Sequence, residues 1–417
     1  MRTIVVSTLI IAVSIGCSTD EIPTKTAEQP AKSSLEQPVT AGPDPGWKVE
    51  ELRSPAGYSS VSPQLTAQSG RVILSWLDLN QSRATLRFSE RSTTGWTTAR
   101  TVFEGEDLIV NTADVPSVVA LADGTLAAHW LQRDGSDPEA YKLPISWSKD
   151  SGATWSPPQL PHHDGKQVLH GFASLFQMPG AGLGLVWLDG RATTASDGEA
   201  GSMNVWTATY SPDGKQLTET VVDSRVCDCC PLSAATTSDG IVVVYRDRTN
   251  DEIRDTSVVR FEGGRWSTPV TVHDDGWKIN GCPVNGPAVS ARGREVVVAW
   301  FTAANDQGRA FVAFSHDGAR SFDAPIRVDE KSSVGEVDVE LLPDGSSAVT
   351  WIEFGEPSQS KLRRIEKSGA RSPAITLADM SKGRAARLVQ AKDELVVAWP
   401  ELDNGGPTIR TVRIPLQ

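Results

Sequence analysis

The most regular feature of the chain is a short apolar segment that ends in an aromatic residue and recurs seven times. Each copy is rich in Val, Leu, Ile and Ala, which is typical of a buried strand. Successive aromatic residues are 48 to 58 residues apart, and they are Trp76, Trp130, Trp187, Tyr245, Trp300, Trp351 and Trp399. A unit of this length, repeated through the chain, predicts a repeat architecture.

Weaker strand patterns surround each of these segments. One short strand precedes it, as in the stretch from Pro116, and two follow it, as in residues 84–91 and 96–103. Four strands in each repeat are typical of one blade of a β-propeller.

The two ends of the repeat array complement each other. The seventh repeat ends after three strands, whereas residues 47–54 have a strand pattern but no blade of their own. If this N-terminal strand lies outermost in the last blade, the ring closes and leaves no exposed sheet edge. The sequence therefore predicts an all-β protein with a single propeller of seven four-stranded blades over residues 46–417.

Composition agrees with this interpretation and excludes one class of partner. The 417 residues include 35 Gly, 26 Pro and 13 Trp, which favours short strands and many turns. There are 40 Lys and Arg against 52 Asp and Glu, a formal net charge of -12. We therefore expect no nucleic-acid binding, which would favour a basic face.

The N-terminus has the pattern of a targeting segment. Arg2 precedes an apolar stretch that is too short to span a bilayer and ends in Ser-Ile-Gly-Cys. Residues 1–16 therefore predict a signal peptide, and Cys17 resembles the lipidated cysteine of a bacterial lipobox. Residues 17–45 are rich in Pro, Thr, Ser, Glu and Lys and predict a disordered tether. We expect an exported, lipid-anchored protein, more often at the outer than at the inner membrane; plain secretion is the alternative.

Two segments resemble the Asp-box (BNR) repeat of the sialidase superfamily. Residues 148–155 match Ser-x-Asp-x-Gly-x-Thr-Trp at every specified position, and residues 315–322 match it with the Gly shifted. Residues 225–255 and 281–289 also look like bacterial propellers labelled exo-alpha-sialidase. The resemblance implies a propeller, with six blades as the alternative to the seven counted, and it implies activity on glycans.

The resemblance also implies chemistry that this chain meets only in part. Sialidases hold the substrate carboxylate with three Arg and use a late Tyr nucleophile. An Arg fork suits a carboxylate because it donates two parallel hydrogen bonds. The chain offers Arg191, Arg246 and Arg248, but no Tyr follows Tyr245. Whether the protein is an enzyme therefore stays open, and no catalytic residue is assigned.

Strand order predicts which residues share one face of the propeller. Loops that enter the innermost strands and loops that follow the second strands open on the same face, called the mouth below. We expect ligand-binding side chains there. The candidates are Asp114, His170, Asp189, Arg191, Arg246, Asp247, Arg248 and Glu336. The alternative is that the Arg and Asp residues form salt bridges between blades.

Four cysteines fall in this same loop layer: Cys227, Cys229, Cys230 and Cys282. In an exported protein they favour disulfides, and a bond from Cys282 would join blades four and five. The rival hypothesis is a copper or zinc site with His170 as a further ligand. His162 and His163 are interpreted as a solvated loop pair.

Three functions are compatible with the sequence. The first is a sialidase-like surface lipoprotein that acts on or binds acidic sugars at the mouth. The second is a non-catalytic lipoprotein that binds a glycan or a protein. The third is a periplasmic metal-linked or redox-linked factor built on the cysteines. We expect an anionic small ligand or glycan as partner, membrane contact only through the lipid anchor, and a monomer.

Overall fold

A computed structural model of the chain describes residues 40–68, 70–180, 182–193, 201–379 and 386–416. The predicted signal peptide, Cys17 and the predicted tether up to residue 39 lie outside the described residues. All described residues belong to one unit, Glu36–Gln417.

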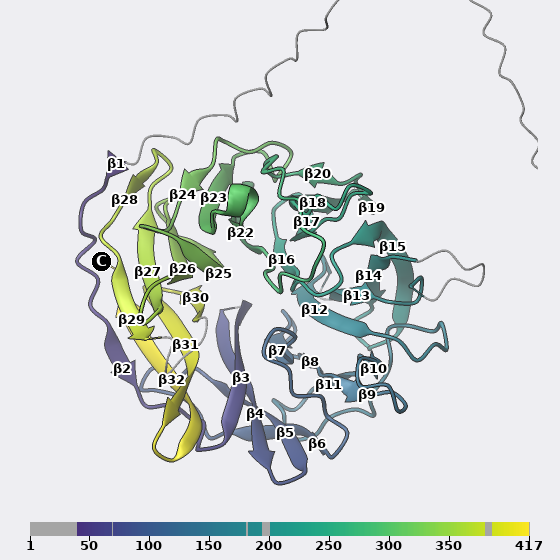
Figure 1. The fold of residues 1–417 in the computed structure, drawn as a ribbon. Helices are drawn as coiled ribbons and strands as arrows, with labels where there is room; N and C mark the ends of the chain where they lie inside the picture. Colours follow the sequence, from purple (N-terminus) through teal and green to yellow (C-terminus); the bar gives the residue numbers. More distant parts are fainter. Residues whose placement is uncertain (1–39, 69, 181, 194–200, 380–385, 417) are drawn as a thin grey trace, which may run out of the picture. The chain divides into compact units, whose positions relative to one another are not determined.

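The apolar repeats form strands, and seven mainly antiparallel sheets are arranged as the blades of a propeller, with a separate two-stranded sheet beside one blade (Figure 1). The all-β fold with seven blades is confirmed, and the six-bladed alternative is wrong. Each recurring aromatic residue lies in or directly after the second strand of its blade, where Trp76, Trp187, Trp300 and Trp351 are fully buried.

The first four blades follow chain order. Blade 1 contains β3 (Ser60–Gln68), β4 (Arg71–Asn80), β5 (Arg83–Glu90) and β6 (Arg100–Gly105). Blade 2 contains β7 (Ser117–Ala120), β8 (Leu126–His129) and β11 (Ile145–Ser148), with β9 (Gln132–Arg133) and β10 (Tyr141–Lys142) paired beside it. Blade 3 contains β12 (His170–Gln177), β13 (Leu183–Asp189), β14 (Met203–Tyr210) and β15 (Gln216–Val226). Blade 4 contains β16 (Ser233–Thr236), β17 (Gly240–Arg246), β18 (Thr256–Glu262), β19 (Arg265–Trp266) and β20 (Val270–Thr271).

Blades 5, 6 and 7 are formed by the rest of the chain, and the N-terminal strands that join blades 6 and 7 are described below. Blade 5 contains β21 (Ala288–Arg292), β22 (Glu295–Thr302), β23 (Arg309–Ser315) and β24 (Ile326–Arg327), with the short 3-10 helix η1 (Ala304–Asp306) between β22 and β23. Blade 6 contains β25 (Ser333–Leu341), β26 (Ser347–Glu353), β27 (Gln359–Ile365), β28 (Ala370–Arg371) and β29 (Ile375–Asp379). Blade 7 contains β30 (Arg387–Ala391), β31 (Glu394–Asp403) and β32 (Gly406–Pro415).

The N-terminal strand closes the ring as predicted. β2 (Glu50–Leu52) pairs with β32 in antiparallel register, with Glu51 opposite Val412. Apolar side chains of blades 1 and 7 pack together at this seam, including Trp76 and Ile409. Within the segment predicted as tether, β1 (Thr40–Ala41) pairs in parallel with β28 at the outer edge of blade 6.

The two Asp-box-like segments lie in turns after the third strands of blades 2 and 5. In the first, the Ser148 hydroxyl donates to Asp150 at 2.8 Å and accepts the backbone N–H of Gly152 at 2.7 Å. In the second, the Ser315 hydroxyl bonds Asp317 at 2.9 Å. Because neighbouring strands run in opposite directions, these turns open on the face opposite the mouth. They close hairpins and do not reach the mouth.

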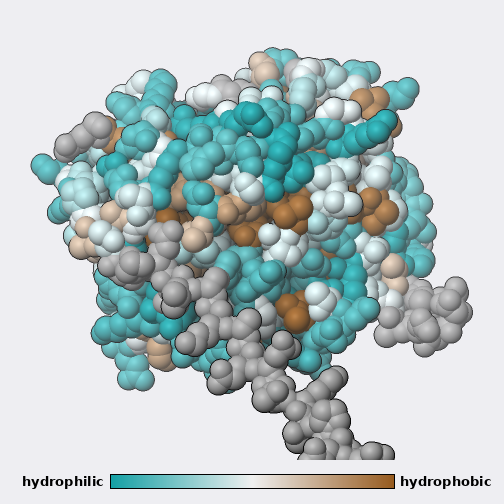
Figure 2. Space-filling model, turned by 90° about the horizontal axis from the view of Figure 1, so that it is seen from above, coloured by the Kyte–Doolittle hydropathy of each residue, from teal (hydrophilic) through white to brown (hydrophobic). Residues whose placement is uncertain are grey.

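Among the described residues, no helix has the length and apolarity that a bilayer crossing would require. The face in Figure 2 is mostly hydrophilic, with small hydrophobic patches that are separate from one another.

Candidate functional site

The innermost strands of all seven blades surround a cavity at the mouth, in the middle of the ring (Figure 1). Its volume is about 440 Å³, within the range of ~300–1,000 Å³ that small-molecule sites occupy. The residues that line it include, in order of blades, Gln64, Asp114, Phe172, Leu232, Asn285, Asp338 and Arg387. Its walls are mixed, because apolar side chains such as Phe172 and Leu232 lie among many hydroxyl, amide and charged side chains.

Bulges in three innermost strands shape this cavity. The strand pairing shifts register in β3, β12 and β25, at equivalent places near the start of each strand. Each bulge contains a non-glycine residue with positive φ: Ser62 at 54°, Phe172 at 53° and Glu336 at 51°. Bulges re-aim side chains, and such backbone strain is concentrated at functional sites. Nothing in the sequence marks these three positions as bulges.

Asp114 lies in the loop that enters blade 2 and is almost fully buried in the cavity wall. The Tyr141 hydroxyl donates to its Oδ2 atom at 3.0 Å, whereas Oδ1 has no hydrogen-bond partner among the described residues. Burial raises the pKa of Asp114 to about 7, although bonds from Phe172 and Tyr141 oppose the shift. Gly171 allows this arrangement, because a Cβ there would lie 2.2 Å from Oδ2 of Asp114.

A second carboxylate enters the cavity from β25. The backbone N–H groups of Val339 and Leu388 donate to Asp338 at 2.9 and 3.0 Å. Burial raises the pKa of Asp338, and the charge of Arg387 partly offsets that effect. Glu336 precedes it in the same strand and also lines the cavity; its backbone N–H donates to Asn285 at 2.7 Å.

The channel continues towards the opposite face as a second cavity of about 600 Å³. Glu340 of β25 lines it and accepts a hydrogen bond from the Ser290 hydroxyl at 2.8 Å. Burial raises the pKa of Glu340 to about 8. Sequence reasoning missed Asp338 and Glu340. The alternation of acidic and apolar residues in Glu-Val-Asp-Val-Glu, over 336–340, was the available signal, because alternate residues of a strand share one face.

Arg191 is held by carboxylates and an aromatic ring. Two of its guanidinium nitrogens contact Asp189, at 2.9 and 2.7 Å, and Glu219 lies 2.8 Å from it. The guanidinium stacks over Trp206 at 3.7 Å. Asp189 is fully buried and also accepts the indole N–H of Trp187 at 2.8 Å. Both residues therefore have charged or aromatic partners within blade 3.

Arg246 is buried between blades 4 and 5. Its guanidinium donates to the backbone carbonyls of Asn285, Arg254 and Phe301, at 2.8, 2.6 and 2.7 Å. The group also lies over Trp277 at 4.8 Å. These contacts join three chain segments, so this side chain serves the interface between blades.

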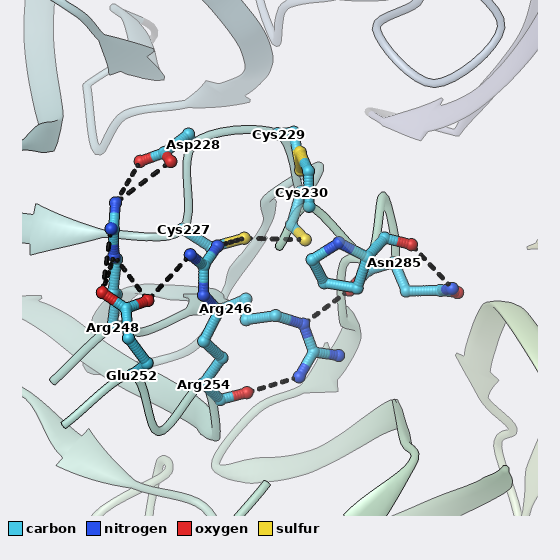
Figure 3. The surroundings of a disulfide bond; sticks show 11 residues. Cys227, Asp228, Cys229, Cys230, Arg246, Arg248, Glu252, Arg254 and Asn285 are labelled. Atoms are coloured by element: carbon cyan, nitrogen blue, oxygen red, sulfur yellow. Dashed lines mark hydrogen bonds and ion pairs between the residues drawn. A yellow bond between two sulfur atoms is a disulfide. The ribbon is translucent and has the colours of Figure 1, made fainter. Parts of the chain in front are cut away.

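Arg248 and Asp247 also have partners in the same loop layer. Arg248 contacts both oxygens of Glu252 at 3.1 Å or less and both oxygens of Asp228 at 3.1 Å (Figure 3). Asp247 accepts the Ser257 hydroxyl at 2.8 Å, and burial raises the pKa of Asp247. Of the eight predicted ligand-binding residues, the described lining of the cavity contains Asp114 and Glu336, and not the three arginines.

His170 stands in a buried cluster beside the cavity wall. Its ring stacks on that of His162, with centroids 3.6 Å apart. Asp164 lies 3.2 Å from Nε2 of His170 and 3.4 Å from Nδ1 of His162. Burial lowers the pKa of His162 to about 3. The interpretation of a solvated pair therefore fails for His162, which is buried, and fits only the exposed His163.

The four cysteines meet in the loops that enter blades 4 and 5 (Figure 3). A disulfide joins Cys229 to Cys282, whose Cα atoms are 6.0 Å apart. Cys227 and Cys230 are free thiols, with their sulfur atoms 3.1 Å apart. The hydrogen bond with Cys230, more than the one from Arg254, lowers the pKa of Cys227 to about 6. Burial raises the pKa of Cys230.

Two groups of side chains are close enough to serve as metal ligands in the described part of the chain. They are Cys227, Cys229 and Cys230, and His162, Asp164 and His170. Sulfur ligands suit copper(I) or zinc. Cys229 is engaged in the disulfide, so the first group would need reduction before all three sulfurs could bind. His170 belongs to the second group and not to the cysteine cluster. A copper or zinc ion at the cysteines stays a prediction.

Comparison with known proteins identifies the fold. The sequence matches no family model and no curated protein. A lectin from Burkholderia pseudomallei superposes with a TM-score of 0.61 at 14% identity, over 84% of this chain and 95% of that chain. A variant of the alpha-L-arabinofuranosidase Arb93a from Fusarium graminearum, bound to an iminosugar inhibitor, gives a TM-score of 0.50 at 12% identity, over 88% and 97%.

A variant of the NanB sialidase from Streptococcus pneumoniae also matches, with a TM-score of 0.48 at 9% identity, over 88% and 94% of the two chains. At such identities these structures show the fold alone, which is a β-propeller. The recognition made from the sequence is confirmed at that level.

Proposed function

We propose that this protein binds a glycan in the cavity at the mouth, and that the glycan is neutral. The observation that carries the proposal is the charge of the lining. Asp114, Glu336 and Asp338 contribute carboxyl groups, and Arg387 is the one cationic residue among the described lining residues. Carboxylates accept hydrogen bonds from sugar hydroxyls and repel a sugar carboxylate.

The size and surface of the cavity support the same ligand class. A volume of about 440 Å³ suits a short saccharide better than a polymer chain. Phe172, Leu232 and Pro283 provide apolar surface against which the C–H face of a sugar ring can pack. The lectin with the same fold is a further argument for glycan binding.

The expectation of an acidic sugar depended on a positive mouth. Arg191 and Arg248 are paired with carboxylates, and Arg246 donates to backbone carbonyls. Freeing Arg191 or Arg246 for a ligand would cost existing charge-assisted contacts, worth ~1.5–3 kcal/mol, and freeing the more exposed Arg248 would cost about 0.5–1 kcal/mol. A neutral glycan requires no such exchange.

The test begins with a glycan array, which identifies the neutral and sialylated oligosaccharides that the full chain binds. Titration of the full chain with these oligosaccharides then gives their affinities. We expect a neutral ligand, with binding weakened tenfold or more in Asp114→Asn and Asp338→Asn. Asp251→Asn, which changes an exposed turn, is the matched control and should bind as the wild type does. Melting curves establish that each variant folds. Preference for a sialylated ligand, lost in Arg191→Ala or Arg248→Ala, would overturn the proposal.

A second candidate function is glycoside hydrolysis, and the environment of Asp114 favours it. A carboxyl group whose pKa is raised to about 7 can donate a proton near neutral pH, as the general acid of a glycosidase does. Turnover of aryl glycosides by the wild type that is lost in Asp114→Asn, although this variant still binds the ligand, would select hydrolysis over binding alone.

We also propose that the chain is exported as a monomer and anchored at the outer membrane through Cys17. The support is the N-terminal sequence pattern. Because one acyl chain gives reversible anchoring and a bacterial lipoprotein carries more, a Cys17→Ser variant should move from the membrane to the soluble fraction. Unchanged membrane association of that variant would refute the anchor.

A further inference from the structure

The cysteine cluster joins two pairs of different character. Cys229 and Cys282 form the disulfide, whereas Cys227 and Cys230 are thiols with 3.1 Å between their sulfur atoms. The sulfurs of Cys227, Cys229 and Cys230 all lie within 4.8 Å of one another, so a dithiol stands directly beside a disulfide (Figure 3).

The two pairs differ in their access to solvent. The thiols of Cys227 and Cys230 belong to residues that are each 1% exposed. Cys229 is half-buried, and Cys282 is exposed on the loop that enters blade 5. The spacing of Cys227 and Cys230 is that of a Cys-x-x-Cys pair, a spacing that closes into a disulfide in redox proteins.

A fixed cation stabilises the thiolate form of Cys227. Arg254 donates to the Cys227 sulfur at 3.3 Å, and its other terminal nitrogen is held by Glu252 at 3.0 Å. The thiolate is the attacking species in thiol–disulfide exchange, so this contact favours Cys227 as the nucleophile.

We propose that the four cysteines form one thiol–disulfide exchange centre, in which the disulfide moves between Cys229–Cys282 and Cys227–Cys230. First, the Cys227 thiolate attacks the sulfur of Cys229; a Cys227–Cys229 bond forms, the Cys229–Cys282 bond breaks, and Cys282 leaves as a thiolate. The Cys230 thiol then loses its proton to the Cys282 thiolate. Its thiolate attacks Cys227, and Cys229 leaves as a thiolate that takes a proton from solvent.

The net reaction converts one dithiol and one disulfide into another dithiol and another disulfide, so it needs no external oxidant or reductant. Its effect is to exchange a buried thiol pair for a pair in which Cys282 is solvent-exposed. It also opens the covalent link between blades 4 and 5. Residues 283–287, which follow Cys282, line the cavity at the mouth, so the exchange changes one wall of it.

The exchanged state can be trapped by its own exposed thiol. The full, folded chain is treated with iodoacetamide in buffer free of thiols, then denatured and treated with an isotopically heavy form of the reagent. Trypsin separates residues 226–246, which hold three cysteines, from residues 279–292, which hold Cys282. The label added before denaturation is called light, and the one added afterwards heavy. We expect the light label on Cys229 and Cys282, with Cys227 and Cys230 joined to each other by a disulfide.

Three variants test the order of the steps. In Cys227→Ser, light labelling of Cys282 should slow at least tenfold. In Cys230→Ser, Cys282 should still be labelled, but Cys227 should be joined to Cys229. In Arg254→Gln, labelling of Cys282 should slow several-fold, which keeps the proposal testable even if a cysteine variant fails to fold, as judged by its melting curve.

Three outcomes would overturn the proposal. One is a light label on Cys227 and Cys230 with the Cys229–Cys282 bond intact. Another is a light label on Cys282 with a heavy label on Cys227 and Cys230, because an outside reductant would then be the electron source. The last is a heavy label on all four cysteines together with stoichiometric copper or zinc in the purified chain, which would assign a metal site instead.

Discussion

The arginine-rich loops of blades 3 and 4 and the central cavity lie on one face, yet their charged groups are stabilised in different ways. Each arginine of the loops has a carboxylate or a set of carbonyls as its partner, as Arg248 has Glu252. In the cavity, the buried Asp114 has a hydroxyl as its partner, and the half-buried Asp338 has backbone N–H groups. The comparison teaches that charged residues on one face can be stabilised in two ways, by ion pairs and carbonyl contacts in the loops or by hydroxyl and backbone N–H donors in the cavity wall.

The largest effect should come from the most buried arginine. Arg246→Ala would leave three backbone carbonyls without their donor and a hole between blades 4 and 5. We expect the free energy of unfolding in urea to fall by about 4 kcal/mol. Arg294→Ala, at a mostly exposed position, is the control and should change it by about 0.5 kcal/mol or less. A loss below ~1 kcal/mol for Arg246→Ala would show that this arginine does not join the blades.

On the cavity side, the close approach at Gly171 should matter next. A methyl group there would meet Asp114 at 2.2 Å and the ring of Tyr141 at 2.5 Å. Gly171→Ala should therefore lower the free energy of unfolding by about 3 kcal/mol through overpacking. Gly57→Ala, where a Cβ would have no atom within 4 Å, should be close to neutral. Equal melting curves for the two variants would contradict the packing described around Asp114.

The two regions should respond to pH in opposite directions. Burial raises the pKa of Glu340 to about 8, so its contribution to stability is full below about pH 4.5 and is lost as pH rises towards 8. Arg248, and then Arg254, lower the pKa of Glu252 to about 2, so its contribution is lost as pH falls from about 4.5 towards 2.

Glu340→Gln should therefore stabilise the protein at pH 8 by about 2 kcal/mol and have little effect at pH 4. Glu252→Gln should instead destabilise it at pH 7 and have little effect near pH 2. Urea unfolding across this pH range measures both. Slopes of the same sign for the two variants would contradict the comparison.

The smallest effect should come from the partly exposed arginine of the loops. Arg248→Ala removes contacts with Glu252 and Asp228, which are themselves partly exposed. We expect a loss of about 0.5–1 kcal/mol in the free energy of unfolding, reduced further by high salt. A loss above ~2 kcal/mol, insensitive to salt, would place this pair in the same class as Arg246.

The repeat pattern was enough to predict the propeller, because each blade buries its own apolar second strand and the period of the pattern is long. The loop layer at the mouth was predictable for the same reason: strand order places Asp114 and Cys230 on one face. Which carboxylate pairs with which arginine was not predictable. Arg191 lies two residues after Asp189 in the sequence, but its contact with Glu219 comes from another strand, and only the fold brings them together.

The bulges in the innermost strands are a further feature that could not be predicted from the sequence. Ser62, Phe172 and Glu336 have no residue type in common, yet all three adopt positive φ at equivalent places. The constraint is imposed by the ring of innermost strands and not by local propensity, so no single-sequence pattern predicts it. The same holds for His162, whose burial depends on its stacking with His170.

The seam between β2 and β32 has a consequence for the order of folding. The strand at residues 50–52 is synthesised early, but its partner at residues 411–413 is synthesised much later, because a long stretch of chain separates the two. Contacts of such sequence separation are formed late and slowly. Until then β32 is an open edge of blade 7 that can pair with another chain. Removal of residues 408–417 would therefore leave β2 without its partner and the polypeptide prone to aggregation, because closure of the ring depends on β32.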